Sequence, residues 1–301
     1  MRILLIGASG QIGSALRRTL PLLADLIVID RTNLDFARPE HVRQRVMQAQ
    51  PNLIVNAAAY TDVEGAENDE TAAFMVNADS VGELALAARD LGATLVHYST
   101  DYVFDGLKPA PYDEDDDPHP LSVYGRSKLE GEQRIRNAGC PHLILRTSWV
   151  YAAQGRNFLS TMLRLGRERP ELRIVDDQVG APTYARFIAE ATADLLMRAA
   201  TDGHARNRLE EGDTVHLVSE GTTSWFGFAG EIFAKAQAAG YVPTPRLVPV
   251  RSLEFPSRVQ RPRNSRLSLA RAKTVWGLHP PTWQQSLSEC VDELGFEFEQ
   301  I

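Results

Sequence analysis

Short apolar runs alternate with longer amphipathic stretches along the first half of the chain. Five runs have the length and composition of strands, at residues 3–6, 26–29, 53–55, 94–98 and 143–145. Continuous apolar runs of this kind are typical of strands buried on both faces of a parallel sheet. Helical periodicity lies between them, up to Pro21, over 40–49, from about 68 to 91 and over 123–135. Strands and helices that alternate this regularly predict an α/β fold with a doubly wound parallel sheet of Rossmann type.

The order loosens beyond residue 150. Residues 185–199 have the pattern of a helix that packs back on the sheet, and residues 215–218 read as a short strand. Thr222, Thr223 and Ser224 form a helix N-cap signal for residues 225–239.

Composition indicates a soluble globular protein. With 301 residues, 44% of them hydrophobic, the chain can fill a large core. A formal charge of -7 argues against nucleic acid or an anionic membrane as a partner. Cys140 and Cys290 lack metal or redox spacing, and no apolar run is long enough for a signal peptide or a membrane span. We therefore expect a cytoplasmic protein.

A glycine-rich turn follows the first strand. Gly7, Gly10 and Gly13 stand between this strand and a helix, where they allow a tight turn and close approach to a pyrophosphate. Asp30 ends the second strand about 20 residues on, where a ribose-binding acid is expected. Asp30 favours NADH, whereas Arg31 suits the 2′-phosphate of NADPH, so the choice between the two stays open. Further residues expected at the cofactor are Gln11, Ile12, Asp35, Phe36, Ala57, Ala58, Ala59, Tyr60, Ser99, Tyr124 and Lys128.

These signals divide the chain into two predicted units. Residues 1–148 form an NAD(P)-binding Rossmann domain, with the helix at about 185–199 packed back on it. Residues 149–301 form mainly a smaller C-terminal α/β domain that binds the substrate.

The strongest chemical signal is the pair Tyr124 and Lys128. Four residues apart on a helix, they share one face. A cation ~4 Å from a phenol, at an effective dielectric of about 20, stabilises the phenolate by roughly 4 kcal/mol, or about three pKa units. Tyr124 would then titrate near neutral pH and serve as a general acid toward a carbonyl, with Thr100 holding the carbonyl oxygen. Such a pair alone is more often a solvated helix face, and the surrounding motifs favour the catalytic interpretation.

Three other features have less specific interpretations. His97 lies inside a predicted strand and reads as a packed core histidine. The acidic residues 113–117 read as a solvated surface. The basic residues 258–273 suit the diphosphate of a nucleotide sugar, although a basic surface face explains most of them equally well.

With these residues assembled, the chain resembles the extended short-chain dehydrogenase/reductase family, and within it the reductases of dTDP-sugars. The resemblance covers nearly the whole chain. Its motifs lie at residues 7–13, 56–63, 99–106, 123–128, 146–151, 177–183 and 261–267.

The resemblance implies that NADPH or NADH reduces the 4-keto group of dTDP-4-dehydro-β-L-rhamnose, giving dTDP-β-L-rhamnose. By this resemblance, Tyr124 donates the proton. Lys128 lowers the pKa of Tyr124 and contacts the nicotinamide ribose. Thr100 takes the place of the usual serine. The positions that line the sugar and nucleotide pocket are Val63, Thr100, Asp101, Tyr102, Trp149 and Asn157.

Assembly and two rival functions stay open. Some relatives are dimers bridged by magnesium, but Ala15 and Arg186 stand at the matching acidic positions. We therefore expect no bound metal, and either a monomer or a homodimer. A nucleotide-sugar epimerase or dehydratase would use the same tyrosine and lysine, although Tyr102 stands where a dehydratase needs Glu. A cofactor-binding regulatory subunit without turnover is the third interpretation.

Overall fold

The computed structural model describes residues 1–30, 34–240, 244–254 and 259–295. Its centre is a parallel six-stranded sheet with the order β10-β5-β4-β3-β1-β2. The strands are β1 (Arg2–Ile6), β2 (Asp25–Ile29), β3 (Leu53–Asn56), β4 (Thr94–Thr100), β5 (His142–Thr147) and β10 (Asp213–His216). The chain runs from β1 to β2 on one side and then returns to β3 on the other. This reversal is the position where open α/β sheets bind ligands, at the carboxyl ends of the strands.

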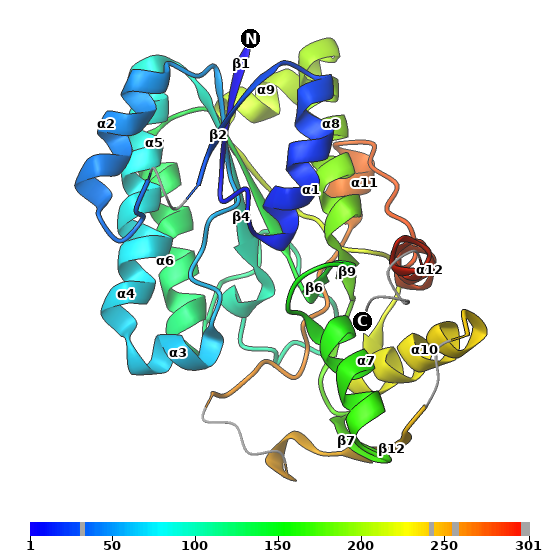
Figure 1. Ribbon diagram of the computed structural model, residues 1–301. Coiled ribbons are helices and arrows are strands. Elements are labelled where there is room, and N and C mark those ends of the chain that lie inside the picture. Colours follow the sequence, from blue (N-terminus) through cyan, green and yellow to red (C-terminus); the bar gives the residue numbers. More distant parts are fainter. Residues whose placement is uncertain (31–33, 241–243, 255–258, 296–301) are drawn as a thin grey trace.

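Helices cover both faces of this sheet (Figure 1). One face carries α1 (Gln11–Thr19), α8 (Ala185–Thr201) and α9 (Gly203–Glu211). The other carries α2 (Pro39–Ala49), α5 (Ser80–Leu91) and α6 (Val123–Ala138). Each face buries its own cluster of aliphatic side chains against the strands, so the sheet is covered on both sides as its apolar sequence predicts.

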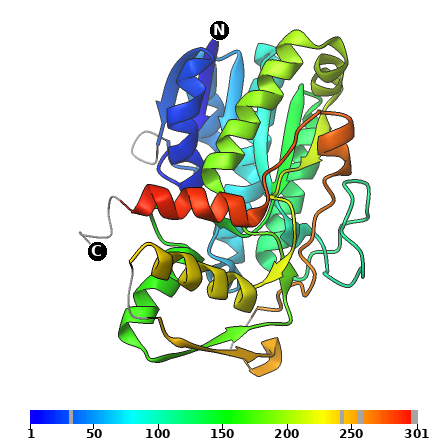
Figure 2. The ribbon, with the colours of Figure 1, turned by 90° about the vertical axis from the view of Figure 1, so that its right-hand side faces the viewer.

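A second lobe lies below the carboxyl edge of the sheet (Figures 1 and 2). It contains α7 (Phe158–Glu168) and α10 (Trp225–Ala238), and β7 (Glu171–Val175) pairs in parallel with β12 (Arg246–Val250). Helix α12 (Trp283–Leu294) lies between this lobe and the sheet domain. Two short pairs complete the lobe: β6 (Val150–Tyr151) with β9 (Thr183–Tyr184), and β8 (Val179–Gly180) with β11 (Thr223–Ser224). Single turns and short helices are η1 (Leu20–Leu22), η3 (Asp101–Val103), η4 (Ser252–Glu254) and α11 (Ala270–Thr274).

The long helix expected over residues 68–91 is interrupted. The structure has α3 (Val63–Asn68), α4 (Glu70–Phe74), a π-helical turn η2 (Met75–Asp79) and then α5. The wider turn presents Asn77, whose amide bonds both backbone groups of Tyr60 and the hydroxyl of Ser127. Gly131 of α6 lets the helix approach the backbone of this turn closely, because a Cβ at Gly131 would lie 2.2 Å from the Asn77 carbonyl oxygen. Tertiary hydrogen bonds therefore override the simple helical pattern.

The sheet reaches beyond residue 148. Strand β10 pairs with β5, so the edge strand comes from the part of the chain assigned to the second unit. The domain boundary at residue 148 stays a prediction. The first unit as predicted, residues 1–148, does not include β10 or α9, which belong to the sheet domain in space. The helix at 185–199 does pack back on the sheet, as expected.

The interpretation of residues 113–117 as a solvated surface is wrong for part of the run. The Glu114 side chain is only 3% exposed, and its carboxylate accepts from the His216 amide. Asp116 pairs with Lys108, and Asp115 pairs with Arg271. The partners of Asp116, Glu114 and Asp115 lie 8, 102 and 156 residues away from them in the sequence. The local density of acidic residues therefore does not predict these pairs. Among the described residues, no helix has the length and apolarity needed to cross a membrane.

Candidate active site

The glycine turn meets the loop after β3 at the point where the strand order reverses. Gly7 has a left-handed backbone, with φ of 80°, and a Cβ there would lie 2.4 Å from the Ala58 nitrogen. A Cβ on Gly13 would lie 2.1 Å from the Gly7 carbonyl oxygen. Helix α1 therefore begins with its amides close to a surface formed by backbone, which fits the pyrophosphate of a dinucleotide.

Replacing Gly13 tests this arrangement. We expect Gly13→Ala to weaken NADPH binding at least about tenfold, because the added methyl must push the turn away from helix α1. Fluorescence titration with NADPH measures the loss. Gly230→Ala is the matched control: it adds a methyl within α10, with no atom within 4 Å, and should leave NADPH binding unchanged. Equal affinities for both variants would contradict the assigned role of Gly13.

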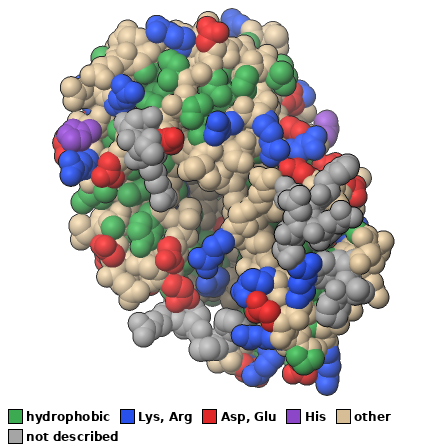
Figure 3. Space-filling model, in the orientation of Figure 1, with side chains coloured by type: hydrophobic (Ala, Val, Ile, Leu, Met, Phe, Trp, Pro, Cys, Tyr) green, Lys and Arg blue, Asp and Glu red, His purple; other side chains and the backbone are tan. Residues whose placement is uncertain are grey.

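A single cleft of about 1290 Å³ extends from the glycine turn to α6 and the second lobe. Figure 3 shows this face hollowed between the two parts, with basic side chains gathered beside the hollow. Within the described ranges, all the predicted cofactor and substrate residues except Gly13 line the cleft. Gly13 lies behind Gly7, and Arg31 lies outside the described residues.

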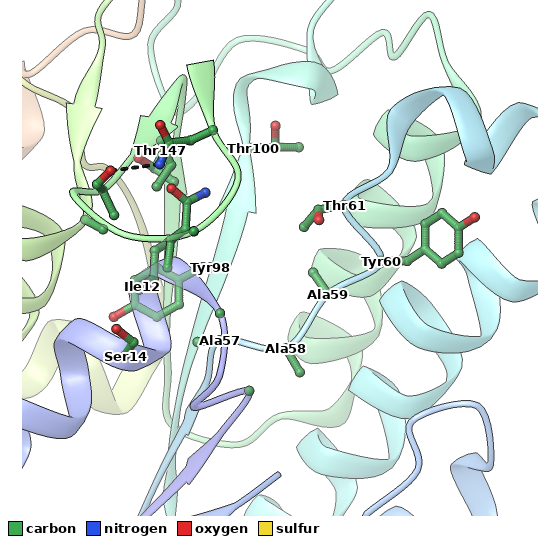
Figure 4. Close-up of a pocket in the computed structure, with 18 of the residues that line it drawn as sticks. Ile12, Ser14, Ala57, Ala58, Ala59, Tyr60, Thr61, Tyr98, Thr100 and Thr147 are labelled. Carbon is green, nitrogen blue, oxygen red and sulfur yellow. Dashed lines mark hydrogen bonds between the residues drawn. The ribbon is translucent and has the colours of Figure 1, made fainter. Parts of the chain in front are cut away.

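The wall formed by Ala57, Ala58 and Ala59 carries only methyl groups (Figure 4). Such a wall lets a flat ligand lie close to the backbone. The ring of Tyr60 points away and packs in the apolar cluster beneath α3 and α4. Thr100 points into the space opposite this wall.

Strand β4 is two residues longer than expected, so Ser99 and Thr100 form its carboxyl end rather than the loop beyond it. The Thr100 hydroxyl donates to Asp101 at 3.1 Å and also hydrogen-bonds Tyr124. Asp101 is almost fully buried, and its Oδ2 has no hydrogen bond within the described part of the chain. Burial raises its pKa to about 6, against hydrogen bonds from Ser265 and Thr100. The site therefore holds a carboxylate with one oxygen available to a ligand.

Two tyrosines face each other at this end of the cleft. The rings of Tyr102 and Tyr124 meet edge to face, with centroids 5.5 Å apart. Burial raises the pKa of Tyr102 to about 12, and it also raises the pKa of Tyr124 above its usual value. Both phenols thus keep their protons at neutral pH.

The effect expected of Lys128 on Tyr124 is absent in this structure. Burial raises the pKa of Tyr124, and the hydrogen bond with Thr100, not the charge of Lys128, is what opposes this rise. The ammonium is instead turned toward β4, where Nζ lies 2.6 Å from the Tyr98 carbonyl oxygen and 3.0 Å from Nε2 of His97. Burial lowers the pKa of Lys128 to about 8. Tyr124 and Lys128 share one face of α6 and both line the cleft, but this spacing does not determine the direction of the lysine side chain.

A buried ion pair that no sequence motif predicts lies one helical turn beyond Lys128. Glu132 binds Arg146 of β5 through two hydrogen bonds of 2.9 and 2.7 Å, and both side chains are at most 2% exposed. Arg136 makes a third bond to Glu132. The spacing could have placed Glu132 on the same face of α6 as Tyr124 and Lys128, because positions 124, 128 and 132 repeat every four residues.

The second lobe contributes a stack of aromatic rings. Trp149 has a left-handed backbone (φ of 49°), and its ring stacks on Trp225 with centroids 3.7 Å apart. Phe158 packs on Trp225 in turn, and all three line the cleft. Gly180 makes room, since a Cβ there would lie 2.7 Å from the Trp149 ring. Trp225 and Phe158 were not predicted, because aromatic residues in a helix pattern look like ordinary core positions. Asn157 caps α7 and also lines the cleft.

The basic segment mostly serves the fold. Arg266 bonds Asn264 and the Pro109 carbonyl, and Lys273 pairs with Glu220. Burial raises the pKa of Asp177, but hydrogen bonds with Ser252 lower it below its usual value, and the charge of Arg263 adds the smallest contribution in the same direction. Arg261 is the member of the segment that lines the cleft, paired with Glu64 at 3.5 Å. Arg258 lies outside the described residues.

Ala15 is buried in α1, and Arg186 pairs with Glu190 on α8. Within the residues that the structure describes, no group of three or more His, Cys, Asp and Glu side chains is arranged to hold a metal ion.

The chain matches known proteins over nearly its whole length. The family described as the RmlD substrate binding domain matches residues 1–296. The chain is 45% identical to a dTDP-4-dehydrorhamnose reductase of Burkholderia thailandensis, over 98% of this chain and 99% of that protein. It is similar to the structure of a dTDP-4-dehydrorhamnose reductase from Clostridium acetobutylicum (TM-score 0.89, 34% identity, 98% and 99% coverage). It is also similar to the Bacillus anthracis reductase in complex with NADP (TM-score 0.87, 35% identity, 97% and 99% coverage).

Proposed function

Since the chain belongs to the family of the RmlD substrate binding domain, we propose that it reduces dTDP-4-dehydro-β-L-rhamnose to dTDP-β-L-rhamnose with NADPH or NADH. The protein is thus an NAD(P)H-dependent oxidoreductase that makes a nucleotide-sugar donor. The observation that carries the proposal is the single cleft, which joins the glycine turn to Tyr124 and to the aromatic stack of the second lobe.

The residues present fit a nicotinamide dinucleotide. Gly7 and Gly13 leave a cradle that a Cβ would fill, and helix α1 begins beside it. Gln11 Oε1, at the start of α1, is buried with no hydrogen bond to the described residues, which suits a polar ligand. Asp30 would bind the adenosine ribose, and Lys128 would bind the nicotinamide ribose. When bound, the dinucleotide supplies the hydride.

The chain's own residues would complete the reduction. Tyr124 donates its proton to the ketone oxygen, which Thr100 holds in place. Asp101 has a free carboxylate oxygen for a sugar hydroxyl. Val63, Tyr102 and the stack that includes Trp149 enclose the sugar and nucleotide, while Arg261 is placed for the diphosphate.

A direct assay tests the proposal. Purified protein mixed with NADPH and dTDP-4-dehydrorhamnose should oxidise the cofactor, read as loss of the absorbance of the reduced nicotinamide. UDP-4-keto sugars serve as the matched comparison for the nucleotide base. Binding of both ligands without turnover would favour a regulatory subunit instead. Epimerised product with no net oxidation of NADPH would favour an epimerase.

We also propose a cytoplasmic location. Cys140 and Cys290 are both buried free thiols, which suits a reducing compartment. The nucleotide sugar is the partner that the cleft fits. A monomer and a homodimer without a metal bridge remain the two expected assemblies.

A further inference from the structure

A row of hydrogen bonds runs through the core from the cofactor loop to Lys128. The Ala58 amide donates to Asn56 Oδ1 at 3.1 Å, and Asn56 Nδ2 lies 3.0 Å from His97 Nδ1. On the other side of the ring, His97 Nε2 lies 3.0 Å from Lys128 Nζ. Asn56 and His97 are direct partners on β3 and β4, and the three side chains are at most 1% exposed. Water therefore has no place in this row.

The direction of the row is fixed at its first member. A backbone N–H only donates, so the oxygen of Asn56 must face Ala58 and its NH₂ must face His97. Nδ1 of the ring then accepts, which leaves the ring hydrogen on Nε2, facing Lys128. Burial and Lys128 both lower the pKa of His97, so the ring carries one hydrogen only.

This direction suits a neutral amine and opposes an ammonium. An ammonium offers donors alone, whereas a neutral amine has a lone pair that accepts from Nε2–H. The Tyr98 carbonyl accepts one hydrogen from Nζ in either state. The pKa of Lys128, lowered to about 8 by burial, agrees with a lysine that gives up its proton readily.

Charges from the other elements around α6 do not cancel this effect. Glu132 of α6 raises the pKa of Lys128, but Arg146 of β5 and Arg136 of α6 occupy its carboxylate. From η2, the neutral Asn77 bonds Ser127. Glu67, Glu70 and Asp79 bind the start of α6 or arginines on its outer face. Asp101 of η3 accepts from Thr100, and Glu64 of α3 pairs with Arg261. On α5, Asp90 pairs with Arg43 and Arg89, and Glu83 lies beside Arg134 on the outer face. Among these charged groups, only Glu132 is a cause of the pKa shift of Lys128.

We propose that His97 is a positioning residue for Lys128, and that Asn56 fixes the direction in which His97 donates to it, so that Lys128 is easier to deprotonate. Since the lysine is assigned to the nicotinamide ribose under the proposed function, NADPH should bind best while Lys128 is charged. NADPH affinity should then fall as the pH rises through the pKa of Lys128. The row would link the Ala58 loop, which lines the cofactor cleft, to the lysine.

Asn56→Asp tests the direction with almost no change of shape. A carboxylate accepts from both Ala58 and His97 Nδ1, so Nε2 becomes an acceptor for the ammonium. The alkaline midpoint of NADPH binding, measured by fluorescence from pH 6 to 10.5, should rise by roughly one pH unit. His97→Phe, which removes the opposing donor, should also raise the midpoint. An unchanged or lowered midpoint in either folded variant would overturn the proposal.

The double variant separates direction from added charge. If the carboxylate introduced by Asn56→Asp acted only through its negative charge, it would raise the midpoint equally in the His97→Phe background, and the proposal would fail. If the effect passes through the ring, most of the shift disappears there. Thermal unfolding verifies that each variant is folded, and Asn56→Asp alone suffices should His97→Phe not fold.

Sugar turnover is a separate readout. The binding midpoint needs no sugar substrate, so an inactive wild type would sink the proposed reductase function and leave this test intact. Conversely, an active enzyme with unmoved midpoints would refute only the role of His97. Lys128→Met should abolish the fall of NADPH affinity at alkaline pH, which identifies Lys128 as the titrating group.

Discussion

Tyr124→Phe is expected to lower the rate of sugar reduction by about 10²- to 10⁴-fold, the usual contribution of a positioned general acid. The variant lacks the hydroxyl that hydrogen-bonds Thr100, yet it keeps the ring that meets Tyr102 edge to face. NADPH affinity should change by less than about threefold, because the glycine turn and Lys128 are untouched. Steady-state rates with saturating NADPH, together with a binding titration, measure both values.

Tyr112→Phe provides the matched control. Tyr112 is also buried, with its hydroxyl bonded to Asp105 and its ring stacked on Phe104, but it does not line the cleft. Its loss should cost about 1 kcal/mol of stability and leave turnover within about twofold. Wild-type turnover in Tyr124→Phe would show that another group donates the proton.

The structure changes how this acid is understood. The spacing of Tyr124 and Lys128 predicts a pKa of Tyr124 near neutrality, whereas burial raises that pKa and Lys128 faces His97. Tyr124 therefore keeps its proton through the neutral range. Any alkaline loss of activity below about pH 9 should come from Lys128, whose pKa is lowered to about 8 by burial.

Glu132→Ala is expected to destabilise the protein by about 3–5 kcal/mol, because it leaves Arg146 charged, buried and without its carboxylate. Denaturant unfolding of the wild type and the variant measures the difference. Glu130→Ala on the same helix is the control. Its pair with Arg134 has side chains 39% and 36% exposed, so the loss should not exceed about 0.5 kcal/mol. Similar losses in both variants would refute a special role for the buried pair.

The stability that the Glu132–Arg146 pair contributes should depend on pH. Burial alone would raise the pKa of Glu132, but Arg146 and its hydrogen bonds hold that pKa down, at about 2. A carboxyl with a lowered pKa stabilises the fold above its ordinary pKa near 4.5, and this contribution is lost as the pH falls toward 2. The wild type should therefore lose stability more steeply than Glu132→Gln across that range.

Much of the architecture was predictable because it rests on local signals. The apolar runs placed all five strands of the first half, and Ser224 caps α10 as its hydroxyl predicts. Parallel strands bring their carboxyl ends to one edge, which is why Gly7, Thr100 and the loop at Ala58 could be expected together. Trp225 was missed as a cleft residue, and the pattern did not single out Arg261 among the basic residues 258–273, because both positions depend on how the second lobe packs.

The sequence alone specified the sheet, the glycine turn and the face of α6 that carries Tyr124 and Lys128, since periodicity and turn chemistry act over a few residues. Long-range packing set the direction of Lys128, the partner of Glu132, the π turn at Asn77 and the docking of Glu114. Each of these depends on a buried polar group finding a partner from a distant element. Burial makes an unpaired group costly, but sequence spacing does not reveal which partner will be within reach.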